Sequence, residues 1–354
     1  MRKLLLLLVS IALVVAALSF VPGRVDPAAW QPPPPTPLSG VFAPNDLLKN
    51  ADLLAQGKVY GPEDVAVDAE GRVYGGTQDG KIVRVLADGS VEVFVETGGR
   101  PLGLHFDAAG NLIVADAYRG LLSISPGGEI AVLTTSADGV PFGFTDDLDI
   151  ATDGTIYFSD ASDKFSQSEY MLDLLEMRPH GRLLAYYPAG GETRVLLDGL
   201  YFANGVALSS DESFVLVNET WAYRIRRFWL SGDKAGSNDI FVAELPGFPD
   251  GISGNRTGLF WVALPTTRLA AVDSMHPHPW MKRLSSRLPD WLKPKPVPYG
   301  LVLELDENGT VLASYHDPDG AHLQEITSVQ EHQGSIYLGT LHGDRIGRLE
   351  LPAR

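Results

Sequence analysis

Short runs of apolar, β-branched and aromatic residues recur along the chain, and each follows a turn sequence such as AEG, AAG or TDG. Runs of this length between turns are typical of β-strands. Six of them align with one another: RVYGGT at 72, NLIVAD at 111, TIYFSD at 155, SFVLVN at 213, LFWVAL at 259 and SIYLGT at 335. Where nothing is inserted the spacing is about 40 to 45 residues, a period typical of propeller blades.

Most of the six runs are followed by another strand-like run, so each unit contains three or four strands and no long helix. The sequence therefore predicts an all-β, six-bladed β-propeller over residues 46–354. A β-sandwich or two separate all-β domains is the alternative. Two units carry insertions, at residues 161–180 and 268–299, with short helical patterns. We expect these insertions to form a cap over one mouth of the central channel.

The beginning of the chain has a different pattern. Arg2 and Lys3 precede an uncharged apolar run from Leu4 to Val21. Residues 1–22 are therefore predicted to be a signal anchor or a cleaved signal peptide. An anchor would hold the propeller on the non-cytoplasmic side of a membrane, and cleavage would release it as a secreted or periplasmic protein. Residues 23–45 are expected to be a Pro-rich linker, with PPPPTP as a stiff spacer.

Composition narrows the classes of function. The formal net charge is −16, which argues against nucleic acid as a partner, because phosphate contacts need clustered Lys and Arg. The chain has no Cys, which excludes disulfides, thiolate catalysis and Cys-ligated zinc. The acidity itself is explained most simply by a solvated surface.

One position of the repeat carries oxygen side chains. It stands eight residues before the last residue of each turn, and we call its occupants the lip residues. They are Glu63, Leu102, Asp146, Asn204, Asp250 and, in the sixth unit, Ile326 or Thr327. In the first five units Asp or Gly follows: Asp64, Gly103, Asp147, Gly205 and Gly251. The first strand of each blade lines the channel of a propeller, so the lip residues should ring one mouth.

Four of the lip residues, Glu63, Asp146, Asn204 and Asp250, would then converge on the channel axis. Three carboxylates held together repel one another, and a hard divalent cation removes that cost. Ca²⁺ accepts such a mixed set of oxygen ligands. The lip residues include neither His nor Cys, which argues against zinc. The sequence therefore predicts one Ca²⁺ in the channel. The alternative is that turn chemistry, which favours Asp and Asn before Gly, accounts for the pattern.

Several stretches resemble the strictosidine synthase-like family, and within it the adipocyte plasma membrane-associated proteins, which also have an N-terminal anchor. They are GPEDVAVD, TDDLDIATDGTIYFSDASDKF, LLEMRPHGRLLAYYP, FANGVALSSDESFVLV and PGFPDGIS. The resemblance implies a six-bladed propeller related to gluconolactonases and paraoxonases, many of which hold a channel Ca²⁺ that polarises an ester, lactone or phosphoester. It also implies that Glu63, Asn204 and Asp250 are metal ligands. Asp146 stands where the related hydrolases usually have Asn.

Two departures from the family pattern bear on activity. Strictosidine synthases carry a catalytic Glu in a Gly-Glu-His motif, and here the matching residues are Gly320, Ala321 and His322. Strictosidine synthesis is therefore disfavoured. Paraoxonases have a His at the second-blade lip, where this chain has Leu102.

These patterns lead to an expected function. We expect a membrane-anchored, exported, calcium-dependent hydrolase acting on a small-molecule ester or lactone, like an arylesterase or lactonase. Asp250 is the candidate nucleophile, and Asp147 and His322 are candidate bases, although packing roles are open for the last two. The alternative is a non-catalytic binding or scaffold propeller with a structural Ca²⁺. In the cap, Trp280 and Trp291 are expected either to contact an apolar ligand or to be buried in packing.

Overall fold

The computed structural model describes residue 3 and residues 23–293 and 295–352. The predicted signal segment, residues 1–22, lies outside this part of the chain except for Lys3. Within the described residues no helix is both long and apolar enough to cross a membrane.

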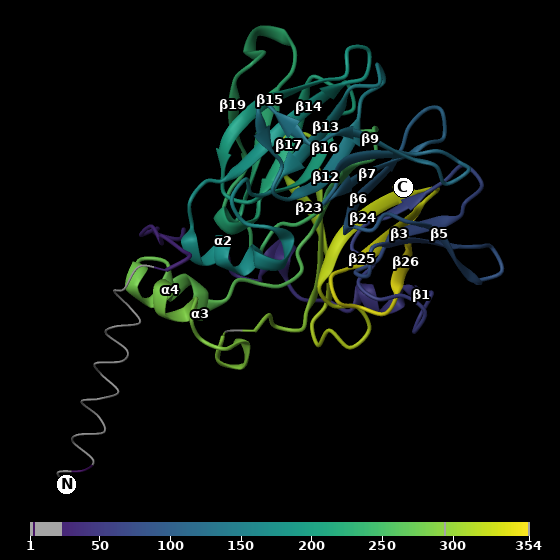
Figure 1. Cartoon of the computed structure of the whole chain (residues 1–354). Coiled ribbons are helices and arrows are strands. Elements are labelled where there is room, and N and C mark those ends of the chain that lie inside the picture. Colours follow the sequence, from purple (N-terminus) through teal and green to yellow (C-terminus); the bar gives the residue numbers. More distant parts are fainter. Residues whose placement is uncertain (1–2, 4–22, 294, 353–354) are drawn as a thin grey trace.

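Six four-stranded antiparallel sheets surround a central axis, so the predicted six-bladed all-β propeller is confirmed (Figure 1). Blade one consists of β2 (Val65–Val67), β3 (Val73–Gly76), β4 (Lys81–Val85) and β5 (Val91–Glu96). Blade two consists of β6 (Pro101–Phe106), β7 (Leu112–Asp116), β8 (Gly120–Ile124) and β9 (Ile130–Thr134). Blade three consists of β12 (Thr145–Ile150), β13 (Ile156–Asp160), β14 (Gly181–Tyr187) and β15 (Glu192–Leu200). A small hairpin, β10 (Ser136–Ala137) and β11 (Val140–Pro141), precedes blade three.

The remaining three blades complete the circle. Blade four consists of β16 (Ala203–Leu208), β17 (Phe214–Glu219), β18 (Arg224–Trp229) and β19 (Asn238–Val242). Blade five consists of β20 (Ile252–Gly254), β21 (Leu259–Ala263), β22 (Gly300–Asp306) and β23 (Val311–Asp317). Blade six consists of β24 (Ile326–His332), β25 (Ser335–Thr340), β26 (Ile346–Glu350) and β1 (Asp52–Leu54). The six aligned runs of the sequence are β3, β7, β13, β17, β21 and β25, the second strand of every blade.

The sixth blade joins the two ends of the propeller. Its outermost strand, β1, pairs antiparallel with β26, and Asp52 lies opposite Arg348. The Arg348 guanidinium also donates to the Asp52 carboxylate, at 2.9 Å. The ring of blades is thus closed by backbone pairing between segments from opposite ends of the sequence.

The Asp residues that follow the lip residues hold neighbouring blades together. Asp64 accepts the Leu104 N–H of the next blade at 2.7 Å, and Asp147 accepts the Val206 N–H of the next blade at 2.8 Å. Each of these carboxylates also accepts the N–H of the residue after it. These bonds satisfy inner-strand donors that face the channel and have no partner within their own sheet.

The Gly residues at the same position serve close approach. A Cβ on Gly103 would lie 2.7 Å from the Asp147 Cα, and a Cβ on Gly205 would lie 2.4 Å from the Asp250 carbonyl oxygen. Any larger residue would push two inner strands apart. The alternation of Asp and Gly after the lip residues is therefore explained by how the blades meet at the axis.

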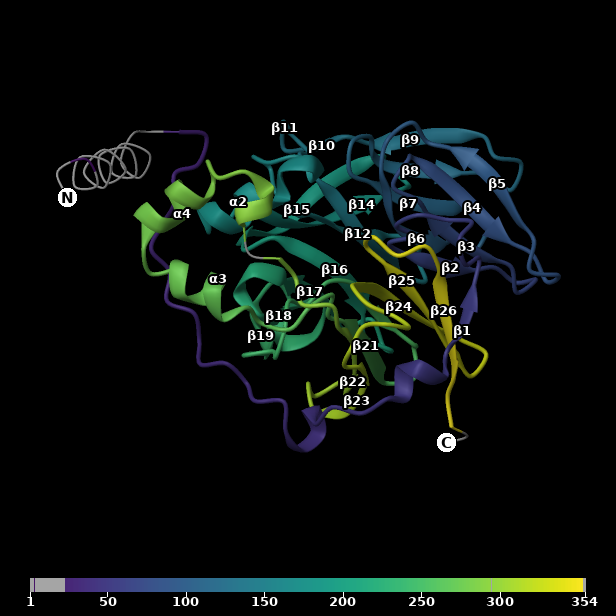
Figure 2. The same ribbon diagram turned by 90° about the horizontal axis from the view of Figure 1, so that it is seen from below.

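The two insertions form the predicted cap at one end of the propeller (Figure 2). The first contains α2 (Tyr170–Glu176), and the second contains α3 (Ala270–Met275) and α4 (Pro279–Ser285). Proline at the start of α4 fits a helix, because the first turn needs no N–H donor there.

The Pro-rich segment, residues 23–45, was expected to be a spacer, and the structure packs it against the cap and the propeller. The Ala28 N–H donates to the Glu176 carbonyl at 2.9 Å, and the Trp30 N–H donates to the His276 carbonyl at 3.0 Å. The Trp30 ring also meets the His276 ring edge-on. The segment is held because its backbone donors find partners on both cap insertions.

Candidate metal centre

A β-bulge sets the lip residues apart from the strands that carry them. In four inner strands the pairing register shifts at this position, so Leu102, Asp146, Asn204 and Thr327 oppose no residue of the neighbouring strand. A bulge leaves its extra residue unpaired and turns its side chain in a new direction. The sequence left Ile326 and Thr327 open for the sixth blade. Ile326 pairs with Thr340 and is fully buried, so the lip residue is Thr327.

The predicted lip residues do come together. A narrow channel of about 40 Å³ is lined by all six: Glu63, Leu102, Asp146, Asn204, Asp250 and Thr327. Glu63, Asp146 and Asn204 are each less than a tenth exposed. Acidic and amide side chains from four blades therefore share one small, buried space.

This crowding changes the acidity of the carboxyl groups. Burial raises the pKa of Glu63, and it raises the pKa values of Asp146 and Asp250 well above the ordinary range. The negative charge of Glu63 raises the last two further. Burial also raises the pKa of Asp64, next to the lip, to about 7. The cluster thus resists carrying its full negative charge without a compensating cation.

Part of the compensation comes from within the chain. The buried Arg100 guanidinium donates to the Glu63 carboxylate at 2.8 Å and to the carbonyls of Gly61 and Gly76. The Asn204 side chain lowers the pKa of Asp250 and so opposes part of the effect of burial. Sequence reasoning missed Arg100, because its pairing with a residue of the preceding blade leaves no local signal.

The lip residues fit a hard cation by the chemistry of their donors. Every polar side chain among them offers oxygen, which suits Ca²⁺ better than a softer metal. In the described part of the chain, no three His, Asp or Glu side chains already stand at metal-ligand spacing. Arg100 draws Glu63 into an ion pair, and one of the four donors is the Asn204 amide, so donor chemistry rather than carboxylate spacing identifies this cluster as a candidate metal site.

The two other predicted catalytic residues are placed differently. Asp147 lines the channel, but its two carboxylate oxygens accept the N–H groups of Leu148 and Val206, both at 2.8 Å. His322 lines neither the channel nor the cavity above it. Its Nε2 lies 2.7 Å from the Ala51 carbonyl oxygen, at the side of blade six. The structure therefore brings Asp250 and Asp147 together and leaves His322 outside.

A larger cavity of about 350 Å³ lies between the lip and the cap. Glu63, Asp146, Asn204 and Asp250 border it on the channel side. Its other walls are mostly apolar and include Phe144, Tyr170, Met171, Leu174, Phe202, Trp221, Phe248, Val272 and Met275. Concave, apolar spaces with a few convergent polar groups are the usual form of small-molecule sites.

Three aromatic walls of this cavity were also missed, although the sequence held a signal for them. Phe144, Phe202 and Phe248 each stand two residues before a lip residue. Phe144 and Phe202 lie directly before β12 and β16, and all three rings line the cavity above the lip. Repeating the lip alignment with a shift of two residues would have found them.

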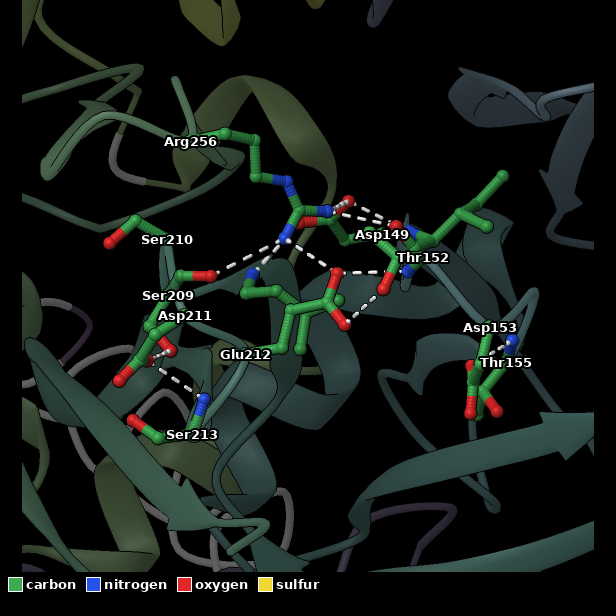
Figure 3. Close-up of polar contacts among 12 residues, drawn as sticks. Asp149, Thr152, Asp153, Thr155, Ser209, Ser210, Asp211, Glu212, Ser213 and Arg256 are labelled. Atoms are coloured by element: carbon green, nitrogen blue, oxygen red, sulfur yellow. Dashed lines mark hydrogen bonds and ion pairs between the residues drawn. The ribbon is translucent and has the colours of Figure 1, made fainter.

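The opposite end of the channel has a different polar arrangement (Figure 3). Arg256 donates to the Asp149 carboxylate at 2.6 Å and to the Ile150 carbonyl at 2.9 Å. Glu212 accepts both the N–H and the hydroxyl of Thr152. This network joins blades three, four and five, and its carboxylates are paired with donors.

Comparison with known proteins agrees with the fold. The strictosidine synthase model matches residues 146–233, and the N-terminal model of strictosidine synthase-like proteins matches residues 40–85. The human adipocyte plasma membrane-associated protein is 38% identical over 363 residues, covering 96% of this chain and 87% of that protein.

Solved structures support the fold alone. A gluconolactonase from Xanthomonas campestris superposes with a TM-score of 0.64 at 20% identity, covering 94% of this chain and 99% of its own. The calcium-binding protein regucalcin from Agrobacterium tumefaciens gives 0.57 at 14% identity, covering 87% and 94%. The 38% identity to the human relative over nearly the whole chain, together with the two family-model matches, shows that the protein belongs to the strictosidine synthase-like family.

Proposed function

We propose that this protein is a membrane-associated, calcium-dependent hydrolase of small-molecule esters or lactones. The observation that carries the proposal is the juxtaposition of Glu63, Asp146, Asn204 and Asp250 with an apolar cavity of about 350 Å³ under the cap. The similar folds of a gluconolactonase and of the calcium-binding protein regucalcin support the same class of function.

The four oxygen donors of the lip would hold the ion. When bound there, Ca²⁺ would act as a Lewis acid toward the carbonyl group of a substrate. The same ion would offset the raised pKa values of Asp146 and Asp250, because a neighbouring positive charge favours the ionised carboxylate.

The chain itself binds and orients the substrate. The aromatic walls, among them Phe144, Phe202 and Phe248, take up the apolar part and exclude bulk water. Asp250 borders both the cavity and the channel, so its carboxylate can accept a proton from an attacking water. The water oxygen bonds to the acyl carbon, the acyl C–O bond breaks, and the leaving oxygen takes the proton. Direct attack by the Asp250 carboxylate is the other route.

Membrane association is part of the proposal. The apolar run from Leu4 to Val21 behind Arg2 and Lys3 supports a single-pass anchor, with the propeller on the non-cytoplasmic side. The name of the human relative describes plasma membrane association for that protein.

A second candidate function is a non-catalytic propeller in which Ca²⁺ is structural. Three observations favour it. Ala321 replaces the catalytic Glu of strictosidine synthases, Leu102 replaces the paraoxonase His, and the Asp147 carboxylate is occupied by backbone donors.

The experiment measures turnover of phenyl acetate and of an aliphatic lactone by the full-length protein in detergent, first with Ca²⁺ and then with a chelator. The hydrolase proposal expects turnover that is lost with the chelator and in an Asp250→Ala variant. If neither substrate is turned over while Ca²⁺ still raises the melting temperature, the structural-calcium candidate replaces it.

A further inference from the structure

The second cap insertion exposes large apolar side chains. Trp280 on α4 is 42% exposed, and Trp291 and Leu292 on the 3₁₀ helix Asp290–Leu292 are 74% and 49% exposed. Val297, a few residues further on, is 43% exposed. We call these four residues the cap face. Neither tryptophan lines the cavity and neither is buried, so both sequence expectations for them are wrong.

The same insertion is basic on an otherwise acidic protein. Residues 268–299 carry six basic residues and two acidic ones, 6 − 2 = +4, whereas the whole chain carries −16. The basic residues are Arg268, Lys282, Arg283, Arg287, Lys293 and Lys295. Four of them, Arg283, Arg287, Lys293 and Lys295, are at least partly exposed beside the cap face.

The chain enters the structure at this same place. A Cβ on Gly23 would lie 2.8 Å from a guanidinium nitrogen of Arg287, just after α4. Val25 is 2% exposed, and the Asp26 carboxylate accepts the Arg178 guanidinium at 2.8 Å. Little slack therefore separates the cap from the apolar run that ends at Val21, because two residues span at most about 7 Å.

We propose that the cap face lies on the lipid bilayer, with its tryptophans at the interface and its basic residues toward anionic headgroups. The inference rests on the membrane anchoring proposed above. Tryptophan is enriched at membrane interfaces, and Lys and Arg beside a membrane are attracted to anionic lipids. A loose tether would allow any orientation, but a chain held at Val25 and Asp26 presents this surface to the membrane.

The orientation has a consequence for substrate access. Lys293, Lys295 and Pro296, which neighbour the cap face in sequence, also line the cavity above the lip residues. The rim of the cavity thus belongs to the surface that meets the bilayer. An apolar ester or lactone dissolved in the membrane reaches Asp250 from the lipid side.

The absence of cysteine permits a direct test with single labels. A polarity-sensitive dye is attached to a Val297→Cys variant of the full-length protein in vesicles of phosphatidylcholine and phosphatidylserine. Val132→Cys is the matched control, because Val132 is a valine of similar exposure, 50%, on β9 away from the cap (Figure 1). We expect a blue shift at position 297 and quenching of its dye by lipids with brominated acyl chains, with neither effect at position 132.

The intrinsic tryptophans give an independent measurement. Brominated lipids should quench the wild-type emission, and a variant with Trp280→Phe and Trp291→Phe should lose most of that quenching, whereas Trp229→Phe should keep it. Equal quenching in all three proteins would overturn the proposal. A dye at position 297 that is shielded from water but is not quenched by brominated lipid would also overturn it, because that result indicates a contact with protein. Flotation of the vesicles reports anchoring, and ester turnover in the same sample reports catalysis. A failure of the proposed function can therefore be told apart from a failure of the cap face to contact lipid.

Discussion

The two ends of the channel use the same residue types for different purposes. At the far end, Asp149 accepts Arg256 and the Leu208 N–H, and Glu212 accepts two groups of Thr152 (Figure 3). At the lip, Glu63 has Arg100, but burial and neighbouring carboxylates raise the pKa values of Asp146 and Asp250.

The difference teaches how to separate a structural carboxylate from a candidate metal ligand. A carboxylate whose oxygens are satisfied by a guanidinium and by backbone N–H groups needs no further cation. A group of carboxylates whose charges raise one another's pKa values is stabilised by whatever positive charge can enter. The cavity next to the lip gives such a charge a substrate to act on.

The strongest test removes one carboxylate charge at each end. Asp250→Asn should weaken Ca²⁺ binding, measured by calorimetry, and lower ester turnover by about 100-fold or more, on the scale of losing a group that stabilises a transition state. Asp149→Asn is the matched control and should change neither quantity, although it should lower the melting temperature. Similar losses of Ca²⁺ affinity in both variants would show that the two ends are not distinct.

An intermediate effect is expected from the cation of the far end. Arg256→Met removes the guanidinium that donates to the Asp149 carboxylate and to the Ile150 carbonyl. Hydrogen bonds to charged groups contribute about 1.5–3 kcal/mol, and a third of the Arg256 side chain is exposed, so we expect a loss of about 1–2 kcal/mol in urea unfolding. The rise in melting temperature caused by Ca²⁺ should be unchanged. A reduced response to Ca²⁺ would mean that the network supports the lip.

The smallest effect concerns pH. Because the pKa of Asp146 is raised in the folded protein, the folded state holds a proton that the unfolded state releases above pH 4. Stability therefore falls as pH rises from the unfolded toward the folded pKa. In chelator, Asp146→Asn should stabilise the protein at pH 8 and have little effect at pH 4. Melting curves at both pH values check this, and equal shifts at both would contradict it.

The repeating parts of this molecule were predictable from sequence. The second strand of every blade was found because its alternation and its turn recur six times, and one frame gave five lip residues. The sixth position stayed open between Ile326 and Thr327 because the first hairpin of blade six is shorter: His332 pairs with Ser335, whereas in blade two Phe106 pairs with Leu112.

The remaining parts depend on contacts between distant segments. Arg100 donates to Glu63 across 37 residues of sequence. The exposure of Trp280 and Trp291 depends on how the cap helices pack against the rest of the protein. Neither follows from a period of two or of 40 residues. His322 was a candidate base because its loop was expected near the lip of blade six, but its ring contacts Ala51 and lines neither the channel nor the cavity.

The pairing of β1 with β26 also constrains biosynthesis. Asp52 and Arg348 are 296 residues apart, so the first strand of the propeller is made long before its partner. At about 5–20 residues per second, the nascent chain waits for roughly 15–60 s with an unpaired strand edge. Exposed edges invite pairing with other chains. A chaperone that shields β1 during synthesis should therefore raise the yield of closed propeller.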